Sequence, residues 1–128
     1  MKPELMLLVW AVVLTLVQAV VAAQGAFGQV GLFTLAGNRE GLPEITGWGG
    51  RAARAHRNML ENLVLFAVLV IVAVLADKTN GTTLLGAQMF LWARVAYAVV
   101  YVAGIPWLRT AIWGVSVAGL VMIFLQLI

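Results

Sequence analysis

The chain has 128 residues, of which 63% are hydrophobic and only 10% are charged, and its mean hydropathy is +1.02. A soluble globular domain carries about 25% charged residues, so this composition indicates one small integral membrane domain. The absence of Cys excludes disulfides and a Cys nucleophile, the single His and five acidic residues predict no metal centre, and the net charge of +3 reflects membrane topology rather than nucleic acid binding.

Four apolar segments predict four membrane-spanning helices. They cover about 5–36, 50–76, 83–103 and 107–128, and a spanning helix needs about 20 apolar residues. The first segment exceeds that length, so this helix should tilt or project from the membrane. The predicted fold is an all-α integral membrane protein, a four-transmembrane-helix bundle that forms a single domain over 1–128.

The first segment has an alternative interpretation. Its basic start, its apolar run and the small residues at 21–23 resemble a secretory signal peptide. Glu4, the length of the apolar run and the three later segments favour a retained helix instead. Gln18 and Gln29 share one helical face with Gly25, which predicts a closely packed helix interface with polar hydrogen bonds.

The distribution of Lys and Arg predicts the orientation. One side of the membrane holds the first and third connections with their flanks, and the other holds the termini and the second connection. The first side carries Arg39, Arg51, Arg54, Arg57 and Arg109, and the second carries Lys2 and Lys78. The positive-inside rule therefore places both termini outside and the Arg-rich side in the cytoplasm.

Polar residues form a stripe that leads into the second apolar segment. Four of them fall within roughly 80° of one another on a helix, and three polar residues of the third segment also share one helical face. These are Arg51, Arg54, Asn58 and Glu61, and then Arg94, Tyr97 and Tyr101. Because lone charges inside a membrane are costly, we expect Glu61 and Arg94 to pair, either within a binding site or only to set helix register.

The stripe has donors and acceptors suited to a small anionic, peptide-like ligand. Arg54 offers a fork of donors for a carboxylate, and Asn58 offers both a donor and an acceptor. Arg57 lies at the margin, where it serves either the same ligand or a lipid phosphate. Arg109 follows Pro106 in a first helical turn, so it either stabilises an anion such as a bound thiolate or extends to the membrane surface.

Two motifs carry a resemblance to a known family. The run Arg51-Ala-Ala-Arg54-Ala-His56-Arg57-Asn58-Met-Leu-Glu61-Asn62 is similar to the signature of the MAPEG family, the membrane-associated proteins in eicosanoid and glutathione metabolism. The second motif is Ala93-Arg94-Val-Ala-Tyr97-Ala-Val-Val-Tyr101, followed by Pro106 and Arg109. The chain is most similar to the microsomal glutathione transferase and microsomal prostaglandin E synthase branches. In its short length it resembles bacterial members of the family.

The resemblance implies a homotrimer in the bacterial inner membrane, with glutathione as co-substrate at subunit interfaces that open to the cytoplasm. It implies a transferase or peroxidase that acts on lipophilic electrophiles or lipid hydroperoxides, with membrane lipids and lipophilic substrates as partners. Arg109 matches the catalytic arginine that stabilises the thiolate. The implied glutathione-binding positions are Arg54, Arg57, Asn58, Glu61, Tyr97 and Tyr101, with Arg94 beside the motif Glu.

Departures from the family pattern argue against eicosanoid chemistry. Gly31 stands where the prostaglandin synthase has an Arg after Gly-Gln-Val, and Asn62 replaces the Tyr of the leukotriene-forming branch. Two other functions stay open: a non-catalytic membrane protein that binds lipid or thiol, and a small four-span transporter. Such transporters carry a Glu embedded in the first span, whereas here that span has only Glu4 at its start.

Overall fold

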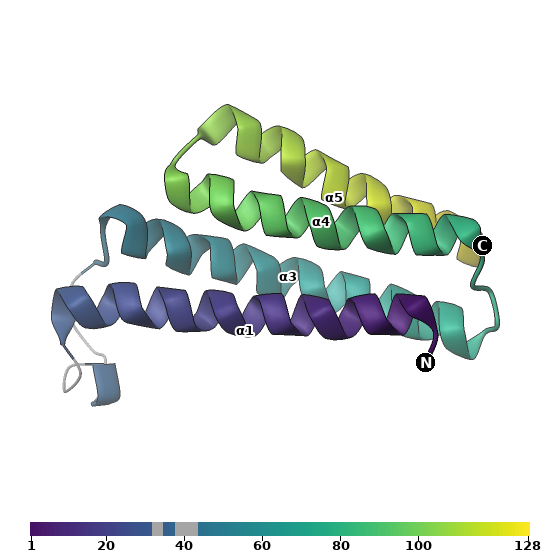
Figure 1. The fold of residues 1–128 in the computed structure, drawn as a ribbon, viewed down its shortest axis with the longest axis horizontal. Coiled ribbons are helices and arrows are strands. Elements are labelled where there is room, and N and C mark those ends of the chain that lie inside the picture. The colour runs from purple at the N-terminus through teal and green to yellow at the C-terminus, as the bar shows by residue number, and fades with distance from the viewer. Residues whose placement is uncertain (32–34, 38–43) are drawn as a thin grey trace.

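The computed structural model describes residues 1–31, 35–37 and 44–128. The chain forms an antiparallel bundle of long helices, with both termini at the same end (Figure 1). The helices are α1 (Pro3–Val30), α3 (Gly47–Leu75), α4 (Gly81–Ala103) and α5 (Pro106–Leu127). Each is long and apolar enough to cross a membrane, which confirms the predicted all-α bundle with four membrane spans. Arg39, used to predict the orientation, lies outside the described residues.

The helix ends follow local backbone chemistry. The first helix was predicted to reach residue 36, but α1 ends at Val30 because Gly31 takes a φ of 84°, a conformation that favours glycine. Its 28 residues still span about 42 Å, more than the roughly 30 Å hydrocarbon core. Asn80 caps α4, since its side-chain oxygen accepts hydrogen bonds from the backbone N–H groups of Thr82 and Thr83.

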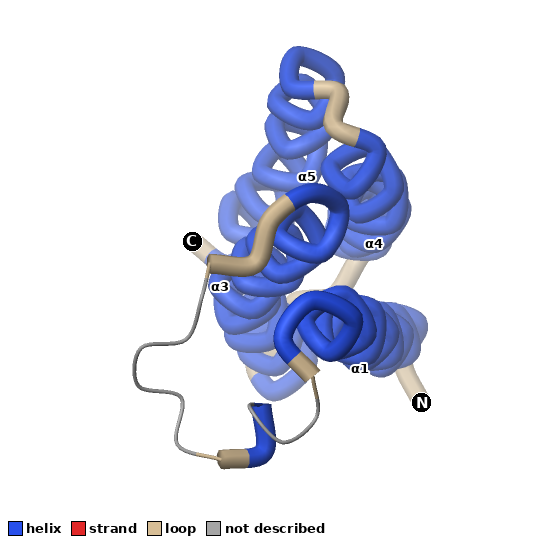
Figure 2. Tube along the Cα trace, turned by 90° about the vertical axis from the view of Figure 1, so that its left-hand side faces the viewer, coloured by secondary structure: helices blue, strands red, loops and turns tan. Residues whose placement is uncertain are grey.

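Two closely packed helix pairs make the bundle. Figure 2 shows α4 beside α5 at one side and α1 beside α3 at the other, and these pairs make the most extensive contacts. A Cβ added to Gly119 of α5 would lie only 2.5 Å from the carbonyl oxygen of Gly86 in α4, so only glycine permits this approach. The buried rings of Phe66 and Phe90 stack at 4.2 Å in the core that joins the pairs.

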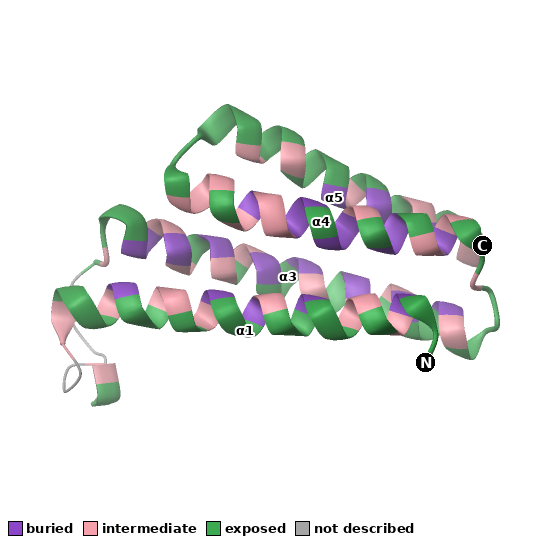
Figure 3. Cartoon of the chain, in the orientation of Figure 1, coloured by how far each residue is buried: buried purple, intermediate pink, exposed green. Residues whose placement is uncertain are grey.

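The buried residues face inward and the exposed apolar residues face outward (Figure 3). Lipid surrounds a membrane protein, so an apolar outer surface is what four spans require. At one end of the α1–α3 seam, the Gln29 amide donates to the Thr46 carbonyl at 2.7 Å and accepts from the Thr46 N–H at 2.9 Å. Gly25 packs against the backbone of Gly49. The predicted close interface with polar hydrogen bonds is therefore confirmed at Gln29 and Gly25.

Candidate functional site

Arg94 is the buried cation of the bundle. Its side chain is 1% exposed, and its Nη2 donates a hydrogen bond to the Asn58 Oδ1 of α3 at 2.8 Å. Its guanidinium carbon lies 4.2 Å from the centroid of the Tyr97 ring, a cation–π geometry. Its Nε and Nη1 are buried and make no hydrogen bond with the residues that the structure describes. The chain thus surrounds this charge but leaves two of its donor atoms free for another acceptor.

The predicted pairing of Glu61 with Arg94 is wrong for a single chain. Arg94 bonds to Asn58 instead, Glu61 is exposed, and the described residues contain no ion pair that involves either of them. Glu61 lies three residues beyond Asn58, so it is about 4.5 Å farther along the helix and 60° around it. That turn carries the carboxylate to the outer surface of the chain.

A fixed amide network positions Asn58. The Asn62 side-chain nitrogen donates to the Asn58 carbonyl oxygen at 2.8 Å and approaches its side-chain oxygen at 3.2 Å. Residues four apart are neighbours on a helix surface, so the Asn-x-x-x-Asn spacing predicts this contact. Asn62 entered the sequence analysis only as a departure from one branch, and its positioning role was missed.

Tyr101 of α4 contacts α3 and α5 near the Arg-rich end of the bundle. Its hydroxyl accepts a hydrogen bond from the Arg54 Nε of α3 at 3.3 Å. The Arg109 guanidinium of α5 lies over its ring, 4.5 Å from the centroid. The ring of Tyr97 lies 5.5 Å from that of Tyr101, centroid to centroid. Two tyrosines and three arginines thus form one continuous cation–aromatic cluster.

A small cavity opens beside this cluster. Its volume is about 160 Å³, and it draws residues from α3, α4 and α5. It is lined by Asn58, Tyr97, Arg109, Thr110 and Trp113. Three of these were predicted site residues. Thr110 and Trp113 were missed, although Trp113 stands four residues after Arg109 and hence on the same helical face.

Other residues of the polar stripe lie apart from the cavity. The Nε of Arg51 donates to the Val102 carbonyl at 2.8 Å and so ties α3 to the last turn of α4. Arg57 is exposed and makes no hydrogen bond within the described part of the chain. Arg57 and Glu61 therefore face the surroundings of this chain, where a ligand or a second chain can reach them.

The geometry defines a class of protein. Three of four candidate membrane spans line a cavity in which an arginine, an amide and a tyrosine can bind a small anion. The family model for MAPEG matches residues 4–128, so the chain belongs to the MAPEG family, whose members are generally glutathione-dependent membrane enzymes. The family resemblance seen in the two motifs is thereby confirmed across nearly the whole chain. No curated protein and no solved structure matches it.

Proposed function

We propose that the protein is a glutathione-dependent membrane transferase of lipophilic electrophiles, with the capacity to reduce lipid hydroperoxides, and that Arg109 is its catalytic residue. One observation carries the proposal: a single cavity brings together Asn58, Tyr97 and Arg109 from three helices. Each of these residues falls on a motif position that the family resemblance links to glutathione. Together with the departures at Gly31 and Asn62, this supports the glutathione transferase branch over an eicosanoid-forming one.

The free donors support an anionic, peptide-like co-substrate. Glutathione carries two carboxylates, and the buried charge of Arg94, which contacts the cavity residues Asn58 and Tyr97, favours an anion in the cavity. Arg54 and Arg57 lie on the same helix as Asn58 and are exposed, so they are available to the other carboxylate. The exposed carboxylate of Glu61 is available to pair with the ammonium group of glutathione.

The size of the cavity supports assembly with a second chain. Sites for small molecules usually occupy about 300–1,000 Å³. The cavity here measures about 160 Å³, which is enough for the thiol end of a tripeptide but not for the whole. A homotrimer, in which a neighbouring chain closes the site over Arg57 and Glu61, would supply the remaining wall.

The chemistry follows from the position of Arg109. A cation in the first turn of α5, beside the positive end of the helix dipole, stabilises the glutathione thiolate over the thiol. The sulfur then attacks an electrophilic carbon, a C–S bond forms, the leaving group departs with its bonding electrons, and the thiol proton passes to water. With a hydroperoxide, two glutathiones supply two electrons: the O–O bond breaks to give an alcohol and water, and glutathione disulfide forms.

The charge distribution supports a cytoplasmic site. Arg51, Arg54 and Arg109 lie at the cavity end of the bundle, while Lys2 and Lys78 lie at the end with both termini. By the positive-inside rule, the cavity would face the cytoplasm of a bacterial inner membrane. Glutathione would then enter from the cytoplasm and the apolar substrate from the bilayer.

The test measures binding and turnover separately in purified protein. Glutathione is titrated by calorimetry in detergent, and turnover is followed with 1-chloro-2,4-dinitrobenzene and with cumene hydroperoxide. Arg109→Ala should lower kcat by about 100-fold or more, the usual loss for one donor to a developing anion, and change glutathione affinity much less. Arg51→Met is the matched control, because this arginine of the same end bonds Val102 outside the cavity.

The outcomes are distinct. Unchanged turnover in Arg109→Ala would reject the catalytic role given to this residue. Glutathione binding by the wild type without turnover of either substrate would indicate a non-catalytic binding protein. The absence of both glutathione binding and turnover would reject the proposed function as a whole.

A further inference from the structure

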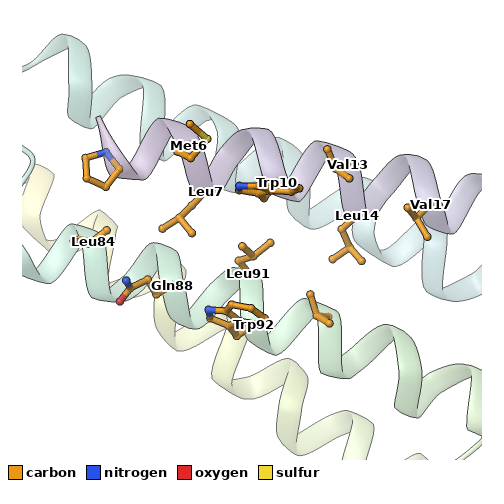
Figure 4. Close-up of a pocket in the computed structure, with 12 residues that line it drawn as sticks. Met6, Leu7, Trp10, Val13, Leu14, Val17, Leu84, Gln88, Leu91 and Trp92 are labelled. Carbon is orange, nitrogen blue, oxygen red and sulfur yellow. The ribbon is translucent and has the colours of Figure 1, made fainter. Parts of the chain in front are cut away.

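A long apolar groove separates α1 from α4 (Figure 4). It consists of two cavities that lie end to end and share Leu14, Val17 and Val95 as walls: the outer cavity, of about 730 Å³, lies nearer the chain termini, and the inner cavity, of about 380 Å³, lies nearer the Arg-rich end. Along α1 the groove runs from Pro3 to Val21, about 27 Å at 1.5 Å per residue. This is close to the roughly 30 Å thickness of the hydrocarbon core, so the groove lies within the membrane.

The groove is separate from the glutathione site proposed above. On α4 it is lined by residues such as Gln88, Val95 and Val102, whereas the cation–aromatic cluster uses Arg94 and Tyr97. At 100° per residue, the two sets face directions about 130° apart on this helix. A ligand in the groove therefore does not depend on glutathione chemistry at Arg109.

One polar side chain in the wall of the inner cavity has an oxygen without a partner among the described residues. Gln18 of α1 is 7% exposed, and its Oε1 is buried and accepts no hydrogen bond from them. It lines this cavity together with Ala52 and Ala55 of α3 and with Val99 and Val102 near the end of α4, so its amide lies toward the Arg-rich end of the spans. A buried amide oxygen without a partner is destabilising.

The lining selects the chemistry of a partner for this amide. No charged side chain lines either cavity, so a charged group would find no counter-ion there. A neutral hydroxyl or amide can hydrogen-bond with Gln18 without that cost.

The outer cavity has the character of a site for a flexible chain rather than for another helix. Its walls carry large side chains, with Leu7 and Trp10 on α1 facing Leu91 and Trp92 on α4 (Figure 4). No Gly, Ala or Ser lines it, although closely packed membrane helices use such small residues. Its volume falls within the 300–1,000 Å³ of small-molecule sites.

We propose that this groove binds a long-chain amphiphile with a neutral hydroxyl or amide group. The polar group hydrogen-bonds with Gln18 in the inner cavity, and the hydrocarbon tail lies in the outer cavity between Trp10 and Trp92. The two indoles also provide a signal for detecting the ligand, because bromine on a bound chain quenches tryptophan fluorescence.

The experiment compares two brominated probes on the purified full chain in detergent micelles. The probes are 9,10-dibromostearamide, which carries the amide, and 9,10-dibromooctadecane, which lacks it. Trp48, Trp107 and Trp113 are replaced by Phe so that quenching reports on the two groove indoles. The amide probe should bind more tightly than the alkane.

Gln18→Met should weaken binding of the amide probe by about 2- to 10-fold and leave the alkane unchanged, because it removes one hydrogen bond and keeps the volume. Gln24→Met is the matched control, since Gln24 is exposed on the same helix, and it should alter neither affinity. Val95→Phe, which fills the junction of the two cavities, should weaken both probes.

Three results would overturn the proposal. The first is equal affinity of the wild type for the two probes. The second is an unchanged amide affinity in Gln18→Met or, should that variant not fold, in Val95→Phe. The third is efficient disulfide formation between chains that carry Val99→Cys, because the chain has no native Cys and such a bond would show that a second copy covers the groove.

Discussion

The contact between Arg94 and Asn58 gives the sharpest test of how the bundle tolerates a buried charge. In Asn58→Ala, the cation loses its hydrogen-bond acceptor in the described part of the chain while it stays 1% exposed. A hydrogen bond to a charged group contributes about 1.5–3 kcal/mol, so the free energy of unfolding should fall by about that amount. Arg94→Met should cost less, because a long apolar side chain fills the space without a buried charge.

The two substitutions together should be strongly non-additive. Once Arg94 is Met, the Asn58→Ala change removes only the contact of its side-chain oxygen with Asn62, worth about 1 kcal/mol or less, because the bond to the residue 58 backbone carbonyl remains. The coupling energy of the double-mutant cycle should therefore be about 1–2 kcal/mol. It is measured by reversible unfolding in mixed micelles with increasing sodium dodecyl sulfate, followed by far-ultraviolet circular dichroism, with Gln24→Ala as an exposed control. Additive effects, within about 0.3 kcal/mol, would refute the idea that Asn58 compensates the Arg94 charge.

Two further substitutions test the packing that supports the site. Gly119→Ala places a Cβ 2.5 Å from a backbone oxygen of α4 and should lower the free energy of unfolding by about 1–3 kcal/mol, whereas Gly114→Ala, with nothing within 4 Å, should be neutral or stabilising. Equal effects in the same unfolding assay would contradict the close approach. Thr83→Val removes the 2.9 Å hydrogen bond to the buried Glu4 side chain and the bonds of the same hydroxyl with the Asn80 backbone at the start of α4, and it should cost about 1–3 kcal/mol, more than Thr82→Val. A smaller cost at position 83 than at 82 would show that these bonds contribute nothing.

The four spans were predictable because a membrane imposes one strong constraint. Every backbone N–H and C=O group in the hydrocarbon must be hydrogen-bonded within its own segment, so a long apolar run predicts a helix. The end of the first helix was not predictable in the same way. The apolar run continues past Gly31, and hydropathy does not register the positive φ that stops the helix there.

The candidate site was predictable as a set of faces but not as a set of contacts. Spacing on a helix placed Asn58 and Glu61 on one side of α3, yet it could not say which of them lies level with Arg94. That depends on the relative shift of two helices along their axes, which side-chain packing sets. For the same reason Thr110 and Trp113 were not predicted as cavity residues. Their position relative to α4 depends on the shift of α5 along its axis, which the contact of Gly86 with Gly119 sets.

The charges at the site explain why a single chain is an incomplete enzyme under the proposed function. A buried guanidinium with one neutral acceptor is costly unless further acceptors are supplied, and Arg94 keeps two buried nitrogens without any. Glu61 and Arg57, which lie on the same helix as Asn58, point outward into surroundings that are apolar or interfacial. A neighbouring chain that covers them, together with an anionic tripeptide that reaches Arg94, would relieve both costs at once. Assembly and co-substrate binding are then linked, because each supplies groups that the other needs.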